Sequence, residues 1–185
     1  MNRLLPIVLC LCLVLSARSQ QHHADGLDDV LQHVPMTSVF VLKACGAEST
    51  SAWPAMALTA IASYGLAAAT TYGLKHAVGE LRPDKSDRRA FPSGHATFAF
   101  AGATMLCHEF GNLSPWIAVG GYTLATLTAI DRVRLDRHYL HDVCAGAAVG
   151  FAATELTYLL KKKLFRSENV DLAFTGQSIE LAIRW

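Results

Sequence analysis

The stretch RVRLDRHYLHD, residues 132–142, places charged and aromatic residues directly before a long apolar run. His138 and Asp142 stand at positions i and i+4, so on a helix the carboxylate can reach the imidazole and fix its tautomer. An oriented imidazole acts as a general base or as a nucleophile. The alternative is a helix-capping histidine with an aspartate that the helix dipole favours near the N-terminus. This stretch alone leaves both interpretations open.

Lys75 and Arg82 form a second polar cluster in an otherwise apolar region. If the helix continues through Gly79, two turns place both cations on one face. Neighbouring positive charges repel each other, so the pair indicates an anion bound between them. The alternative is a solvated helix end.

The third cluster is FPSGH, residues 91–95, which opens a predicted helix. Pro92 before the helix start, Ser93 near the N-cap and Gly94 for close approach leave several backbone N–H groups without helical partners. A phosphate fits such a helix end. His95 beside it can donate a proton to a leaving oxygen. An ordinary N-cap with an incidental histidine would look the same.

Together the three clusters are far more specific than any one of them. The string Lys75-x6-Arg82-Pro83, Pro92-Ser93-Gly94-His95, Arg132-x5-His138-x3-Asp142 resembles the three-part signature of the type 2 phosphatidic acid phosphatase and vanadium haloperoxidase superfamily. The resemblance covers about residues 55–160, most of the chain after its first 19 residues. It implies an all-α helical bundle that binds phosphate.

The resemblance also implies which groups hold the substrate phosphate. Lys75, Arg82 and Arg132 would bind the phosphoryl oxygens, and Ser93 with the backbone N–H of Gly94 would add hydrogen bonds. Fixed cations and a helix end that meet the charge on these oxygens are the main means of catalysis in phosphoryl transfer.

The remaining roles that the resemblance implies belong to three residues. His138 would attack phosphorus to form a phosphohistidine that water hydrolyses, Asp142 would orient it, and His95 would protonate the leaving group. The family uses no metal or other cofactor, which suits a site with three cations and no obvious carboxylate cluster. One departure is Asp131, where the family usually has Ser. Its carboxylate repels a phosphate unless it points away or pairs with Arg132 or Arg134.

Composition sets outer bounds on the function. The 185 residues are 52% hydrophobic and 17% charged, with a formal net charge of +1. A charge so near zero argues against a nucleic-acid binder, and the apolar content excludes intrinsic disorder. A membrane-embedded helical protein stays open.

Apolar stretches predict a helical bundle with a different C-terminal tail. The predicted helices are 27–46, as one amphipathic helix or two short ones interrupted by Pro35, and 55–74, 94–108, 115–130 and 142–160. The stretch 55–74 is long enough to cross a membrane. In the tail, large apolar residues at alternate positions of 178–185, after 170–174 and a turn, indicate a short C-terminal β-hairpin.

The first 19 residues have the pattern of an export signal. Arg3 supplies a positive charge, residues 4–15 are almost wholly apolar, and Ala17-Arg18-Ser19 has the small-x-small pattern of a cleavage site. We expect cleavage after Ser19, followed by an N-terminal helical segment at 20–54, a catalytic core at 55–160, and a basic stretch with the tail at 161–185. An uncleaved anchor is the alternative, but the apolar run is shorter than the roughly 20 residues that span a bilayer.

Three cysteines stay in the chain once Cys10 and Cys12 leave with the signal. They are Cys45, Cys107 and Cys144. Cys107 and Cys144 lie in apolar helical stretches without metal-ligand spacing, which favours a role in packing. Nothing in the sequence selects a disulfide pair.

The superfamily contains both membrane-embedded lipid phosphatases and soluble secreted acid phosphatases. If the apolar helices cross a bilayer, all three motifs fall at one face and the lysines at 161–163 lie on the opposite, cytoplasmic side. We expect a membrane protein with its site on the outer, periplasmic side. A segment at 27–46 that does not cross, and short Ala/Gly-rich helices, would instead suit a soluble periplasmic or secreted protein.

The leading hypothesis is a metal-independent phosphatase whose partner is a phosphorylated lipid or a small phosphate ester. One alternative is a vanadium-dependent haloperoxidase, since vanadate mimics the pentavalent phosphorus transition state. Another is a non-catalytic membrane protein that retains the phosphate pocket, with Asp131 having abolished turnover.

Overall fold

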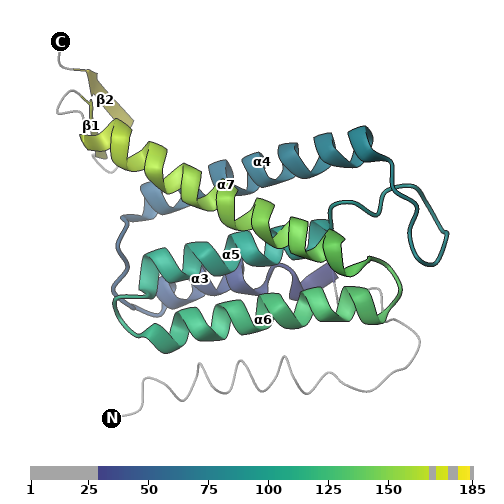
Figure 1. Cartoon of the computed structure of the whole chain (residues 1–185). Coiled ribbons are helices and arrows are strands. Elements are labelled where there is room, and N and C mark those ends of the chain that lie inside the picture. The colour runs from purple at the N-terminus through teal and green to yellow at the C-terminus, as the bar shows by residue number, and fades with distance from the viewer. Residues whose placement is uncertain (1–28, 167–169, 175–178, 184–185) are drawn as a thin grey trace.

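The computed structural model describes residues 29–166, 170–174 and 179–183 (Figure 1). In chain order the elements are α3 (Val34–Ala44), α4 (Trp53–Val78), α5 (Gly94–Phe110), α6 (Pro115–Arg134), α7 (Leu140–Arg166), β1 (Val170–Phe174) and β2 (Ile179–Ile183). The predicted helical bundle is confirmed. The predicted signal peptide lies outside the described residues.

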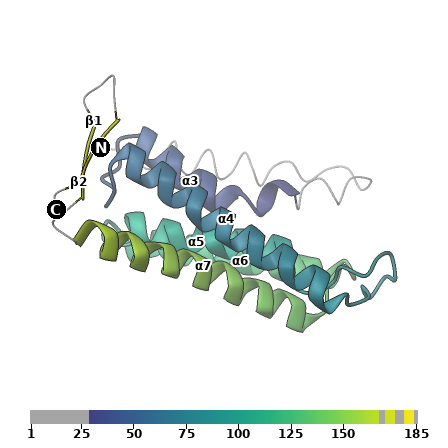
Figure 2. The same cartoon turned by 90° about the horizontal axis from the view of Figure 1, so that it is seen from above.

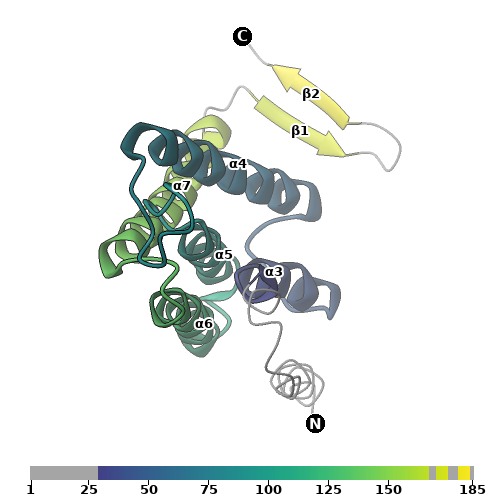
Figure 3. The same ribbon diagram turned by 90° about the vertical axis from the view of Figure 1, so that its right-hand side faces the viewer.

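Helix α5 lies at the centre of the bundle. Seen end-on in Figure 3, it is surrounded by α3, α4, α6 and α7, and it contacts all four. Small residues permit this arrangement: Ala96, Ala99, Ala101 and Ala103 are all fully buried. A helix that is buried on every side is apolar all round rather than amphipathic, which is the pattern of this stretch.

Two glycines bring α7 against the beginning of α5. A Cβ atom at Gly146 would lie 2.4 Å from the carbonyl oxygen of Ser93, and one at Gly150 would lie 2.1 Å from that of Thr97. Because no real side chain tolerates such contacts, glycine is required for this close backbone approach. The seam fixes the start of α7 relative to the first turn of α5.

Prolines begin three of the helices. Pro35, Pro54 and Pro115 occupy the first or second position of α3, α4 and α6, where a missing N–H costs nothing. We expected the segment 27–46 to be one helix or two short ones interrupted by Pro35. In the structure a turn at residues 32–33 separates the helical residues 29–31 from α3, and Pro35 lies in the first turn of α3, which its fixed φ suits.

The ends of α4 and α7 correct two expectations about the motifs. Helix α4 ends at Val78, and Gly79 adopts a left-handed conformation with φ of 59°, so Arg82 lies in the following loop and not on the helix of Lys75. Helix α7 begins at Leu140. His138 therefore precedes the helix that carries Asp142 and does not share its face.

A buried polar network closes the end of the bundle where α5 and α7 finish. Glu109, 1% exposed, accepts hydrogen bonds from the backbone N–H and hydroxyl of Ser51, at 2.9 and 2.6 Å, and from the Tyr158 hydroxyl at 2.6 Å. Lys161 donates to the Ser51 hydroxyl at 2.6 Å, and Lys43 donates to the Ser51 carbonyl. The network ties the loop before α4 to α5 and α7.

The strands form an antiparallel pair with Val170 opposite Ile183 and Phe174 opposite Ile179. The predicted C-terminal hairpin pairing is therefore confirmed. Figure 2 shows the helices lying roughly along one direction, with the strands at one end and the α4–α5 loop at the other.

The three described cysteines are unpaired. Cys107 is half-buried, in keeping with the packing role expected for it, whereas Cys45 and Cys144 are exposed. The expected packing role of Cys144 is therefore wrong, because this position of α7 faces away from the α5 seam.

Candidate functional site

The three motifs meet at one end of the bundle, on the right in Figure 1, where α4 and α6 end and α5 and α7 begin. The junction is made by the backbone: the N–H of Ser93 donates to the carbonyl oxygen of Asp142 at 3.0 Å. The second and third motifs, 49 positions apart in the chain, are thereby held side by side.

Ser93 is the N-cap residue of α5, as the sequence predicts. It is fully buried, and its hydroxyl oxygen accepts a hydrogen bond from the backbone N–H of Ala96 at 3.4 Å. Gly94 is the first residue of the helix. Its N–H belongs to the first turn, whose amides have no partner within the helix and carry the positive end of the helix dipole.

His138 is buried beside the cations. Its side chain is 2% exposed, and its backbone N–H donates to the carbonyl oxygen of Arg132 at 3.3 Å. Burial lowers the pKa of His138 to about 3, and the charges of Lys75, Arg82 and Arg132 act in the same direction. At neutral pH the imidazole is uncharged, as a nitrogen nucleophile must be.

Asp142 lies within reach of His138 despite the change in secondary structure between them. The Oδ2 atom of Asp142 lies 3.5 Å from Nδ1 of His138 and accepts a hydrogen bond from the backbone N–H of Tyr139 at 2.8 Å. The carboxylate is fully buried.

Lys75 reaches across to the second motif. Its ammonium group donates to the carbonyl oxygens of Pro92 and Arg89, both at 2.7 Å. Burial and the nearby Arg82 lower the pKa of Lys75 to about 8, while the carboxylates of Asp142 and Asp87 oppose this shift. The group therefore keeps its charge at neutral pH.

The α4–α5 loop carries Arg82 back toward Lys75. The Nε–H of Arg82 donates to the Asp87 carboxylate at 2.8 Å. Asp84 fastens the loop to the third motif, since its backbone N–H donates to the carbonyl oxygen of Asp136 at 3.2 Å and its carboxylate pairs with Arg137 at 3.1 Å. A pinned loop thus replaces the continuous helix that we expected.

Arg132 is 5% exposed in the last turn of α6. Asp131, the departure from the family pattern, is half-buried on the same helix, and its neighbour Arg134 makes no ion pair with it in the described part of the chain. Successive residues of a helix point about 100° apart. The Asp131 side chain therefore leaves α6 on a different face from that of Arg132.

Asp29 is a member of the site that sequence reasoning missed. Its Oδ1 atom lies 2.8 Å from Nε2 of His95. The His95 side chain is 19% exposed, and that of Asp29 is 66% exposed. Burial and Arg132 lower the pKa of His95, whereas the hydrogen bond and charge of Asp29 raise it. Asp29 precedes His95 by 66 positions, and no motif signals it.

The described residues contain one group of three side chains that could hold a metal ion. It consists of Glu80, His141 and Asp142, whose ligand atoms all lie within 4.8 Å of one another. Nothing in the sequence predicted this group, because Glu80 and His141 occupy unspecified positions of the three-part signature.

Comparison with known proteins yields one curated relative and two solved structures. The chain is 37% identical over 141 residues to the lipid A 1-phosphatase of Porphyromonas gingivalis, covering 76% of this chain but 32% of the relative. It therefore spans about a third of that protein's length. The structures are Aquifex aeolicus LpxE, with a TM-score of 0.58 at 19% identity, and a transmembrane PAP2 type phosphatidylglycerolphosphate phosphatase from Bacillus subtilis, with a TM-score of 0.51 at 18% identity.

The two structural matches cover most of each chain. LpxE matches over 80% of this chain and 94% of its own, and the Bacillus protein over 90% of this chain and 100% of its own. At this level of identity they show a shared fold.

The relatives and the surface together support a membrane protein. Among the described helices, α7 alone is long and apolar enough to cross a bilayer, over Leu140–Lys163, with 33% of its most apolar window buried. Helices α4 and α6, which the sequence also offered as spans, do not reach that apolarity because of their Gly, Thr and Tyr content. Large apolar side chains are nevertheless exposed on both, including Ile61 at 70% and Trp116 at 77%.

The family model described as the PAP2 superfamily matches residues 56–166. This span contains all three motifs and covers more than half of the chain. The resemblance expected from the sequence is therefore confirmed, and the chain belongs to the PAP2 superfamily.

Proposed function

We propose that the chain is a metal-independent phosphatase that hydrolyses a lipid-linked phosphate monoester or diphosphate through a phosphohistidine. The single observation that carries the proposal is the uncharged, buried His138 among Lys75, Arg82 and Arg132. The uncharged imidazole leaves the positive charge of these cations in place, although Arg82 also pairs with Asp87. A tetrahedral anion complements that positive charge and is itself the target of a nucleophile.

The proposed reaction has two steps. An imidazole nitrogen of His138 forms a bond to phosphorus while the bond to the leaving oxygen breaks, and His95 gives that oxygen a proton. Water then attacks the phosphohistidine, releasing inorganic phosphate and restoring both histidines. Asp142 would hold His138 in the productive orientation from its present distance of 3.5 Å.

Two kinds of group would bind the phosphoryl oxygens. Lys75, Arg82 and Arg132 supply positive charge, and Ser93 with the Gly94 N–H would add hydrogen bonds at the start of α5. Charge that develops on the equatorial oxygens then meets groups that are already fixed.

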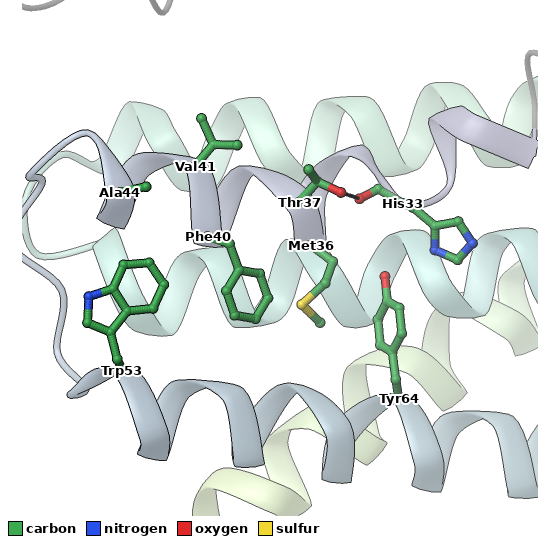
Figure 4. A pocket seen from close by; sticks show the side chains of 8 residues that line it. All are labelled: His33, Met36, Thr37, Phe40, Val41, Ala44, Trp53 and Tyr64. Carbon is green, nitrogen blue, oxygen red and sulfur yellow. Dashed lines mark hydrogen bonds between the residues drawn. The ribbon is translucent and has the colours of Figure 1, made fainter. Parts of the chain in front are cut away.

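An apolar groove supports a lipid substrate. It lies between α3 and α4, has a volume of about 550 Å³, and is lined mainly by aliphatic and aromatic side chains (Figure 4). His33, one turn of chain after Asp29, marks the end nearest the site, and Trp53 marks the far end. The relative named above is a lipid A 1-phosphatase, and its name too points to a lipid-linked phosphate as the substrate.

A substrate panel tests the proposed activity. Purified full-length protein in detergent and EDTA should release phosphate from a long-chain lipid phosphate, from lipid A or from an isoprenyl diphosphate, and less from a small aryl phosphate. His138→Ala should abolish release, while His76→Ala, an exposed histidine on α4, should retain it. Binding of vanadate without turnover of any substrate would instead identify a non-catalytic phosphate binder.

We also propose that the site faces the outer, periplasmic side of the membrane. It lies at the beginning of α7, and the exposed Lys162 and Lys163 lie at the other end, where positive residues favour the cytoplasm. The exposed Cys144 and Cys45 lie near opposite ends of the bundle and report on the two sides. In intact cells expressing Cys107→Ser protein, a membrane-impermeant maleimide should label Cys144 and spare Cys45; the reverse pattern would contradict this orientation.

A further inference from the structure

The group formed by Glu80, His141 and Asp142 lies directly behind the proposed nucleophile. Nε2 of His141 lies 2.9 and 3.1 Å from the two carboxylate oxygens of Glu80 and 3.2 Å from Oδ1 of Asp142. The same Asp142 carboxylate approaches His138 through its other oxygen. A ligand bound to this group would therefore contact Asp142, the carboxylate next to His138.

The ring of His141 is held in place by aromatic neighbours. It stacks on Tyr139 with centroids 5.4 Å apart and planes 8° apart, and it lies 6.2 Å from the ring of Phe91. Its side chain is 58% exposed, so one side of the group is open to solvent. The nitrogen is thus oriented before any ligand arrives.

Asp142 provides a second observation that points to a ligand. The residue is fully buried, and its Oδ1 atom accepts no hydrogen bond from the described residues. The ion-pair contact of Oδ1 is with His141, a member of the same group. A buried carboxylate oxygen without a donor is costly unless a cation or a proton completes it.

The charge balance favours a divalent cation over the histidine alone. Glu80 and Asp142 bring two negative charges together, and within the group a protonated His141 neutralises only one of them. Lys75, which the Asp142 carboxylate also attracts, donates its hydrogen bonds to the carbonyl oxygens of Pro92 and Arg89.

Imidazole nitrogen and carboxylate oxygen atoms are both zinc ligands, with bonds of about 2.0–2.2 Å. Donor atoms on a tetrahedron of that size lie roughly 3.3–3.6 Å apart. The 3.2 Å between Nε2 of His141 and Oδ1 of Asp142 is close to this range, and the 2.9 Å contact of His141 with Glu80 would lengthen by a few tenths of an ångström.

We propose that Glu80, His141 and Asp142 bind a divalent transition-metal ion, with Zn²⁺ the best match, and that the bound ion inhibits the enzyme by holding Asp142 away from His138. The ion would be an inhibitor and not a cofactor. The binding site stands on its own geometry, whereas the inhibition rests on the proposed phosphatase function. Three protein ligands and an open side leave room for water as a fourth ligand.

Calorimetric titration with Zn²⁺ alone tests the site independently of activity. Chelator-stripped, full-length protein in detergent should bind one Zn²⁺ ion at neutral pH, and His141→Ala and Glu80→Gln should each weaken binding at least tenfold. His76→Ala, an exposed histidine outside the group, is the matched control and should bind as the wild type does. Equal binding by wild type and His141→Ala would overturn the site.

Phosphate release with and without Zn²⁺ tests the inhibition. Zn²⁺ should inhibit the wild type and His76→Ala at the concentrations at which it binds, and should leave His141→Ala and Glu80→Gln active. Binding at the site without inhibition would overturn the regulatory part alone. If no substrate is turned over, the calorimetric result still decides whether the site exists, while the proposed function fails separately.

Discussion

Both ends of α5 contain buried polar side chains, but those at one end are fully hydrogen-bonded and those at the other end are not. At its C-terminal end, Glu109 is surrounded by donors from Ser51 and Tyr158, with Lys161 joined through Ser51. At its N-terminal end, Nδ1 of His138 and Oδ1 of Asp142 are buried and accept or donate no hydrogen bond within the described chain. A satisfied network stabilises a fold, whereas buried groups with spare capacity are suited to a ligand.

This difference separates stability from function along a single helix. Substitutions at the Glu109 end should change the free energy of unfolding and leave turnover by the folded protein intact. Substitutions at the His138 end should do the reverse. The following four predictions test that separation.

The largest expected effect is on stability at the Glu109 end. Glu109→Ala leaves the Ser51 N–H and the Tyr158 hydroxyl buried without an acceptor, which should destabilise the protein by about 3 kcal/mol. Thermal unfolding of the wild type and the variant in detergent measures this loss of stability. Glu155→Ala removes a carboxylate that pairs with His108 but is 34% exposed, so it should cost less than about 1 kcal/mol. Equal losses in the two variants would remove the contrast between the ends.

The next largest effect is on activity at the seam between α5 and α7. Gly146→Ala places a Cβ against the Ser93 carbonyl, so α7 must shift away from the start of α5. Displacing a catalytic group by about 1 Å reduces turnover about 100-fold. Gly120→Ala is the control, since its Cβ meets no atom within 4 Å. Full activity in Gly146→Ala would show that the seam does not position the site.

Asp29→Asn should have a smaller and more selective effect. Asp29 raises the pKa of His95 against burial and the charges of Arg132 and Arg82, so its loss should move the alkaline limb of the kcat profile to lower pH. Turnover of alkyl phosphates, whose leaving groups need a proton, should fall about tenfold, and that of aryl phosphates much less. Asp29→Glu should restore part of the difference. A uniform loss for both substrate types would point to a structural role instead.

The smallest effect is expected at Asp131. Because this side chain leaves α6 on a different face from Arg132, it should repel a bound phosphate only through solvent, by about 0.4 kcal/mol at roughly 10 Å. Asp131→Ser should therefore lower KM about twofold and leave kcat unchanged. A decrease of more than tenfold in KM would instead place the Asp131 carboxylate inside the phosphate site.

The motifs were predictable from the sequence because their chemistry is local. Residue type and spacing identified His138, the Ser93 cap and the cations, and hydrophobic stretches predicted the helices. Helix boundaries were less predictable. Gly79 ends α4 three positions before Arg82, and the third motif turns before α7 begins, so two arrangements inferred from a continuous helix were wrong.

What the sequence could not show depends on long-range packing. Asp29 reaches His95 across 66 positions, and Glu80 reaches His141 across 61. The sequence around Glu109 does not indicate that this residue is buried. The donors to its carboxylate are Ser51, in a loop 58 positions earlier, and Tyr158, on a helix 49 positions later. Such contacts arise only when the bundle forms.

The central position of α5 has a mechanical consequence. Because four helices press on it from different sides, its first turn cannot tilt or slide without disturbing most of the interior. Amide dipoles fixed in this way need not rotate as negative charge grows on a transferring group, which keeps the reorganisation energy small. In the proposed reaction, the alanine and glycine packing around α5 would therefore contribute to the barrier height.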